Sequence, residues 1–349
     1  CEMRDVLIDD RLPTVDGKLL FTRNRACPQE MWIALLEKAY AKLYGGYEMI
    51  ACVEPNEVMI DLTGGCAEFI ELEWARNDGL VVFDMLMKLM KNNSTLKCLT
   101  PVNPEVKEDV LENGLVAGHG YCIMDVCQVG DNKLLKLKHP WGDKNKWNGD
   151  WSEKSDKWKS AKKDDKTNKK LETGECWINF ESWLENFMCL VVCHLPTKSA
   201  TKSEWHQVAY KGEWKLGSSA GGPMGEDTFW LNPQFYLQLD PPDSKENSQD
   251  LIPAVISIYQ LGIDRKEIKE ISYDMFRLTT DRLMARGGQY NKDQLQHVIS
   301  LPSYVRERQC SGRHLLPVGA YVIIPSTEFA GEEAKFLLRV FTEIPAIGI

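Results

Sequence analysis

The chain has 349 residues, 43% of them hydrophobic and 27% charged, which is the balance of an ordinary globular protein with room for two or three domains. A net charge of −9 argues against a general nucleic-acid binder, because no overall positive field attracts phosphates. No apolar run approaches the roughly 20 residues of a membrane-spanning helix. The eleven cysteines form no Cys-x-x-Cys pair, so we predict reduced thiols in the cytoplasm rather than disulfides or a zinc site.

The first 62 residues predict a strand, a hairpin-like connection and a helix. Arg4–Ile8 has the composition of a strand. Apolar residues then recur with helical spacing over 32–43, and Gly45-Gly46 ends the pattern. We expect these apolar residues, Trp32 and Leu36 among them, to lie in a core.

A new unit is expected to begin at the glycine pair of Thr63-Gly64-Gly65. A helix is predicted near Asp84–Lys91. Alternating residues over Tyr121–Val129 and Lys133–Lys138 predict two strands of a hairpin. The lysine-rich stretch Lys154–Lys170 could bind polyanions, but its interspersed aspartates favour a solvated loop.

The remainder changes in composition at Pro196–Ser203, where we place a domain boundary. Short apolar runs separated by glycine- and proline-rich turns then predict an antiparallel sandwich. The predicted strands are Trp205–Tyr210, Phe235–Leu239, Ala254–Tyr259, Ala320–Ile324 and Phe336–Phe341. Together with the helices of the first part, they predict an α+β fold class.

Two histidine segments carry the candidate chemistry. His119 stands between Gly118 and Gly120 directly before one predicted hairpin strand, and His139 follows the other, ahead of Trp141. A histidine next to a polar partner on the neighbouring strand is how papain-type cysteine proteases build their general base.

At these residues the chain resembles the calpains, the calcium-activated intracellular cysteine proteases. The resemblance rests on Asp9-Asp10-Arg11-Leu12-Pro13-Thr14, Ala34–Leu43, Thr63-Gly64-Gly65, Gly118-His119, Pro140-Trp141-Gly142, Gly221-Gly222, Phe229–Phe235, Pro325-Ser326-Thr327 and Leu338–Phe341. It implies the later part of a papain-like protease core followed by the calpain-type β-sandwich. Residues 1–62 would be the remnant of the first protease subdomain, 63–195 the second, and 196–349 the sandwich.

The resemblance implies limited endoproteolysis, with His119 as the catalytic base. The family's nucleophile and oxyanion-hole glutamine lie in a Q-G-x-x-G-D-C-W segment that is absent here. We expect that segment upstream of Cys1. Cys122 and Cys127 follow His119 on its own predicted strand, which predicts buried thiols rather than nucleophiles.

The family has asparagine where this chain has His139. An asparagine oxygen accepts the imidazole N–H and orients the ring, whereas a protonated histidine would only donate and would repel an imidazolium. We therefore expect weakened or absent catalysis.

The resemblance also implies a substrate cleft. Gly64, Gly65 and Gly118 would let a substrate backbone approach closely, with plain turn glycines as the alternative. Trp141 would form a wedge near the cleft, with a core tryptophan as the alternative.

Calcium is the implied cofactor, held by carboxylates such as Glu153 and Glu175. Lys146 and Thr173 stand where the family has further carboxylates, which argues against calcium binding at this site.

The implied partners are cytosolic protein substrates. The alternative is a proteolytically inactive, calpain-like protein that acts as a binding or scaffold module. Peripheral membrane or cytoskeletal association through the sandwich is a third hypothesis. No EF-hand loop of the D-x-[DN]-x-[DN]-G form occurs in the sequence.

Overall fold

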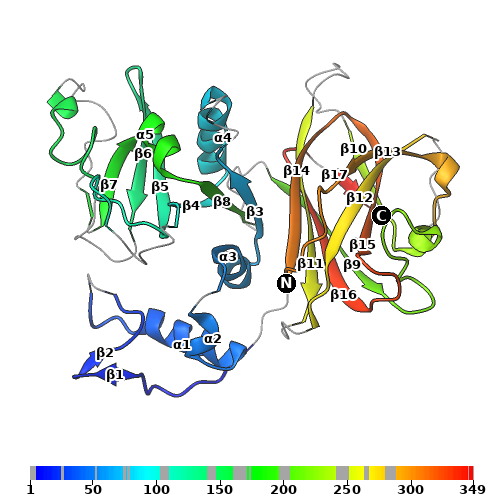
Figure 1. Cartoon of the computed structure of the whole chain (residues 1–349), viewed down its shortest axis with the longest axis horizontal. Helices are drawn as coiled ribbons and strands as arrows, with labels where there is room; N and C mark the ends of the chain where they lie inside the picture. The colour runs from blue at the N-terminus through cyan, green and yellow to red at the C-terminus, as the bar shows by residue number, and fades with distance from the viewer. Residues whose placement is uncertain are drawn as a thin grey trace. The chain divides into compact units, whose positions relative to one another are not determined.

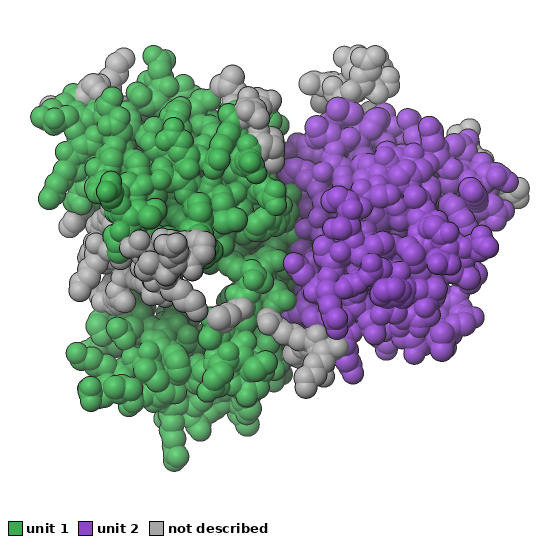
Figure 2. Space-filling model, in the orientation of Figure 1, with its two compact units in different colours: residues 1–195 green, residues 196–349 purple. Residues whose placement is uncertain are grey.

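The chain folds into two compact units, residues 1–195 and 196–349, in a computed structural model (Figures 1 and 2). The structure describes residues 5–24, 27–51, 53–73, 76, 79–102, 110–139, 147–159, 171–172, 174–195, 205–240, 251–262, 267–279, 288–344 and 346–348. Among the described residues, no helix is long and apolar enough to cross a membrane.

The first unit mixes helices with one antiparallel six-stranded sheet of order β3-β8-β4-β5-β6-β7. Its elements are β1 (Thr14–Val15), β2 (Lys18–Leu19), α1 (Trp32–Tyr44), α2 (Tyr47–Ile50), α3 (Pro55–Thr63), β3 (Cys66–Glu71), α4 (Gly79–Lys91), β4 (Thr95–Leu99), β5 (Gly120–Val129), β6 (Asn132–Lys138), the 3₁₀ turn Asp156–Lys159, β7 (Glu175–Asn179), α5 (Phe180–Asn186) and β8 (Cys189–His194).

The core of this unit lies between the sheet and helices α4 and α5. Phe83 of α4 meets Phe180 of α5 edge to face, with ring centroids 5.3 Å apart. Buried residues of β4, β5, β6, β7 and β8 complete the cluster. Its largest fully buried members are Tyr121 and Trp183. Burial of this apolar surface on one face fixes the register of each strand, because a slip by one residue would turn its apolar side chains outward.

The second unit is an antiparallel sandwich of a five-stranded sheet, β13-β12-β15-β10-β17, and a four-stranded sheet, β14-β11-β16-β9. Its elements are β9 (His206–Trp214), the 3₁₀ turn Asp227–Leu231, β10 (Phe235–Leu239), β11 (Ile252–Leu261), β12 (Ile271–Leu278), the 3₁₀ turn Lys292–Gln294, β13 (Leu295–Ser300), β14 (Gln309–Leu316), β15 (Gly319–Thr327), β16 (Ala334–Thr342) and β17 (Ala346–Gly348). Apolar side chains from both sheets form one core. The α+β fold class predicted from the sequence is confirmed.

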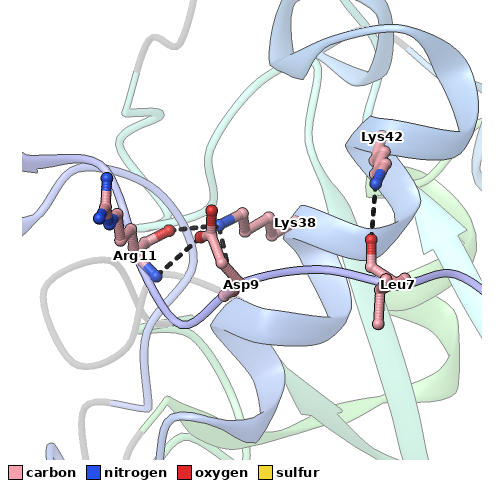
Figure 3. Close-up of polar contacts among 5 residues, drawn as sticks. All are labelled: Leu7, Asp9, Arg11, Lys38 and Lys42. Carbon is pink, nitrogen blue, oxygen red and sulfur yellow. Dashed lines mark hydrogen bonds and ion pairs between the residues drawn. The ribbon is translucent and has the colours of Figure 1, made fainter.

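The segment before β1 is held by lysines of α1 and forms no strand, so the predicted strand at Arg4–Ile8 is wrong over its described residues 5–8. Figure 3 shows the contacts. The Lys38 ammonium binds the Asp9 carboxylate and donates to the carbonyl of Arg11 at 2.5 Å, and Lys42 donates to the carbonyl of Leu7 at 2.6 Å. These backbone carbonyls thus accept from side chains, whereas a strand would require a paired neighbouring backbone.

Helix α1 ends as the sequence predicts. Gly45 adopts the left-handed conformation (φ 100°), and the Gly46 N–H donates to the carbonyl of Ala41 at 2.8 Å. The expectation that its apolar face is core is wrong for Trp32 and Leu36, which are 61% and 41% exposed. Helical spacing shows which residues share a face, but what covers that face depends on the tertiary packing.

Candidate functional site

Two antiparallel strands bring His119 and His139 together. His119 directly precedes β5 and His139 directly follows β6, and these strands pair with Cys122 opposite Lys138. The start of one strand and the end of its antiparallel neighbour lie at the same edge, so the two imidazoles meet there. Their ring centroids are 5.9 Å apart and their planes are inclined at 69°, which is an edge-to-face arrangement.

His139 is deeply placed, with only 3% of its surface exposed. Its backbone N–H donates to the carbonyl of Gly174 at 3.0 Å, which ties it to the segment before β7. The ring of Tyr121 lies 4.8 Å from the His139 ring. The Tyr121 hydroxyl also accepts from the N–H of Val116 at 2.9 Å, three residues before His119. Tyr121 therefore touches both histidine segments.

His119 is half-buried and stands at the end of a tight turn. Gly118 has a φ of +67°, a conformation that other residues adopt only with strain, and its N–H donates to the carbonyl of Pro101 at 2.9 Å. Thr100, which sequence reasoning missed, contacts the backbone of His119 through its hydroxyl. Thr100 directly follows β4, so it could have been found only by predicting β4 and its pairing with β5.

The other two candidate cleft glycines are required by the local backbone conformation and packing. Gly64 ends α3 with a φ of +70°. A Cβ on Gly65 would lie 2.6 Å from both Cys193 Sγ and the carbonyl oxygen of His194, so β8 requires glycine here. These constraints account for Gly64 and Gly65 without a substrate, and a cleft role for Gly64, Gly65 and Gly118 stays a prediction. Trp141 lies outside the described residues.

The two candidate calcium ligands differ in their surroundings. Glu153 is exposed, whereas Glu175 is buried with a carboxylate oxygen 2.6 Å from the ammonium of Lys136. That carboxylate also accepts the N–H of Glu172 at 2.9 Å. Burial raises the pKa of Glu175, but the contacts with Lys136 and Glu172 lower it by more. The net pKa is therefore below its ordinary value.

The described residues contain no group of three or more acidic, histidine or cysteine side chains placed to hold a metal ion. Calcium requires several hard oxygen ligands, and here one carboxylate is already neutralised by lysine. The described part of the site therefore does not fit calcium. Lys146 and Thr173 lie outside the described residues.

The described cysteines include Cys122 and Cys127, the two that follow His119 in the sequence. The expectation of a buried thiol is wrong for Cys122, which is exposed, while Cys127 is half-buried. Strand alternation explains the difference, because Cys122 points away from the core face that its neighbour Tyr121 occupies.

Comparison with known protein families identifies relatives of this chain. A family model described as calpain family cysteine protease matches residues 1–194, and one described as domain III of the calpain large subunit matches residues 210–341. The chain is 34% identical to Calpain-A of Drosophila melanogaster, over 97% of this chain and 43% of that protein. It is 33% identical to the Calpain-1 catalytic subunit of Rattus norvegicus, over 98% of this chain and 50% of that protein.

A solved structure of the cysteine protease and lectin-like domains of Cwp84 from Clostridium difficile aligns with 73% of this chain and 46% of its own length, at 10% identity. The TM-score of 0.19 is too low to bear on the fold. The chain spans 43% and 50% of the length of the two calpains compared above. The matched family models cover the histidine pair and most of the sandwich. The chain belongs to the calpain family of cysteine proteases.

Proposed function

We propose that residues 1–195 supply the base half of an endopeptidase site that cleaves cytosolic proteins at limited positions, with 1–62 and 63–195 as parts of the two protease subdomains and 196–349 as a calpain-type sandwich. His119 is the general base, and His139 is the group that orients it. The observation that carries the proposal is the meeting of the two imidazoles at one strand edge, 5.9 Å apart.

The nucleophile in this proposal is a cysteine from a segment outside residues 1–349. His119 takes the proton of its thiol, and the thiolate sulfur attacks the carbonyl carbon of the scissile peptide. The imidazolium then gives its proton to the leaving amine, which departs and leaves a thioester. Water attacks the thioester while His119 takes its proton, and cleavage of the C–S bond regenerates the thiol.

The test is peptide hydrolysis by the polypeptide extended upstream through the nucleophile segment. We expect His119→Ala to lower kcat by at least about 10³-fold, because a missing base leaves the thiol unactivated. His314→Gln, a change in the sandwich, is the matched histidine control and should leave kcat unchanged. Activity that survives His119→Ala would contradict the proposal, as would an upstream reading frame in which the cysteine is replaced.

One observation favours a second function, that of an inactive binding module. His139 occupies the position of the family's asparagine and is buried, so a charge on its ring would be costly and its shape differs from that of an amide. An extended wild-type chain without hydrolysis, combined with capture of the same protein substrates uncleaved, would support the binding function.

Calcium enters neither version of the proposal through Glu153 and Glu175. We expect isothermal titration of the chain with calcium chloride to show no micromolar binding at this site, because Lys136 already neutralises Glu175. Micromolar binding that Glu153→Gln abolishes would contradict this expectation. Peripheral membrane or cytoskeletal association of the sandwich is tested separately by co-sedimentation.

A further inference from the structure

The turn that carries His119 is held by one buried side chain from the neighbouring strand. Thr100 directly follows β4 and is only 1% exposed. Strand β4 pairs with β5 in a register that sets Leu99 opposite Gly120, so the next pair in that register is Thr100 and His119. The ladder therefore continues one residue beyond the strands.

At this last pair a side chain replaces one of the two backbone bonds. The Thr100 N–H donates to the carbonyl of His119 at 3.0 Å, as in any antiparallel pair. The return bond differs, because the His119 N–H donates to the Thr100 hydroxyl oxygen at 3.0 Å. Because the hydroxyl oxygen takes the place of a backbone carbonyl, the chain can leave the sheet at Pro101 while the His119 N–H keeps a hydrogen-bond acceptor.

The same hydroxyl also controls the start of the turn. Its oxygen lies 2.6 Å from the carbonyl oxygen of Val116 and 3.1 Å from that of His119. The hydroxyl can donate its hydrogen to either of these two carbonyls. One hydroxyl thus spans the turn from Val116 to His119. The Gly118 N–H adds a bond to the carbonyl of Pro101 at 2.9 Å.

We infer that Thr100 is a positioning residue, which sets the backbone conformation of His119 and hence the direction of its imidazole toward the reacting groups. The inference rests on the proposed role of His119 as the base. Catalysis is sensitive to such placement, since a shift of about 1 Å in a catalytic group is worth up to about 10²-fold in rate. Thr100 itself touches no reacting atom.

The substitutions that test this role differ in one functional group. Thr100→Val keeps the shape and removes the hydroxyl, Thr100→Ser keeps the hydroxyl and removes a methyl group, and Thr100→Ala is a smaller variant without a hydroxyl in case valine prevents folding. Thr95→Val, at the exposed start of the same strand, is the matched control.

The first measurement is amide hydrogen exchange by NMR on the 349-residue chain. We expect the His119 amide to exchange at least about tenfold faster in Thr100→Val, because its acceptor is gone, and within about twofold of wild type in Thr100→Ser and Thr95→Val. Unchanged protection in Thr100→Val, or equal loss in Thr100→Ser, would overturn the inference.

The second measurement is peptide hydrolysis by the extended polypeptide. Thr100→Val should lower kcat about tenfold with KM within about twofold, and Thr100→Ser should restore most of the rate. A loss confined to KM, or no rescue by serine, would overturn the positioning role. If the extended wild-type chain hydrolyses nothing, the proposed protease function fails, and hydrogen exchange alone decides whether Thr100 holds the turn.

Discussion

At the scale of single residues, the first unit holds two lysine–carboxylate pairs between β6 and the region of β7, and they differ in burial: Glu175 is the first residue of β7, and Glu172 precedes it. Glu175 is 3% exposed where it meets Lys136, whereas Glu172 is 72% exposed where it meets Lys138 at 2.9 Å. A buried charge that loses its partner is left uncompensated, while an exposed one is screened by water. The two pairs should therefore contribute unequally to stability.

Glu175→Gln should lower the free energy of unfolding of this unit by about 3 kcal/mol, because it leaves the Lys136 ammonium beside a neutral amide. Glu172→Gln should cost less than about 1 kcal/mol. The measurement is urea unfolding followed by tryptophan fluorescence at pH 7. Equal effects of the two substitutions would contradict this difference between the buried and the exposed pair.

The pH dependence of the Glu175 effect has a definite sign. Because the pKa of Glu175 is lowered in the folded chain, its contribution is fully present above the ordinary value of 4.5 and is lost as pH falls through the folded value. The stability difference between wild type and Glu175→Gln should shrink over that range. A difference that grows on acidification would show that the pair is wrongly assigned.

At the scale of elements, the sequence was most informative where local pattern and turn chemistry agree. The hairpin β5–β6 was predicted from alternation around a turn that begins at Gly130, and its register explains why His119 meets His139. Strand β7 was not predicted, because four of its five residues are buried and it shows no alternation. The contact of Thr100 with His119 was equally hidden, since it depends on β4, another strand that the pattern did not reveal.

Gly65 directly precedes β3 and packs against the end of β8, which gives a prediction about its replacement. Gly65→Ala should destabilise the first unit by about 2 to 4 kcal/mol, because the new Cβ would meet the backbone of His194 at 2.6 Å. Gly130→Ala is the matched control, with open space around its Cβ and only a positive φ to strain it, and should cost about 1 kcal/mol. Thermal unfolding of both variants checks this, and a smaller cost at Gly65 than at Gly130 would contradict it.

At the scale of the whole molecule, each unit has its own core, and the stability of each unit depends on pH through its own buried titratable groups. In the sandwich, burial lowers the pKa of His314 to about 4, and its Nε2 lies within hydrogen-bond distance of the Tyr273 hydroxyl oxygen, at 2.7 Å. The folded sandwich thus holds this histidine neutral, whereas the unfolded chain protonates it near its ordinary value of 6.5.

The sandwich should therefore be most stable above pH 6.5 and lose up to about 3 kcal/mol through this residue as pH falls to about 4. His314→Gln should remove that part of the loss. Calorimetry of the chain between pH 7 and pH 4 measures it, through the transition that the substitution shifts. Identical pH profiles for wild type and His314→Gln would rule the effect out.

The family could be recognised from short motifs, because these motifs include glycines that the backbone conformation or close packing requires. Gly65 and Gly118 are examples, one required by close packing and the other by a positive φ. The exposure of Trp32 was not readable, since burial of a helix face depends on elements that the local pattern does not specify.

We propose that His139, in place of the family's asparagine, weakens a calpain-type base at His119. The most direct test compares peptide hydrolysis by the polypeptide extended through its nucleophile with that of its His139→Asn variant. We expect asparagine to raise kcat/KM by at least about tenfold, because an amide oxygen accepts the imidazole N–H without competing for protons. Equal and robust rates in both proteins would contradict it.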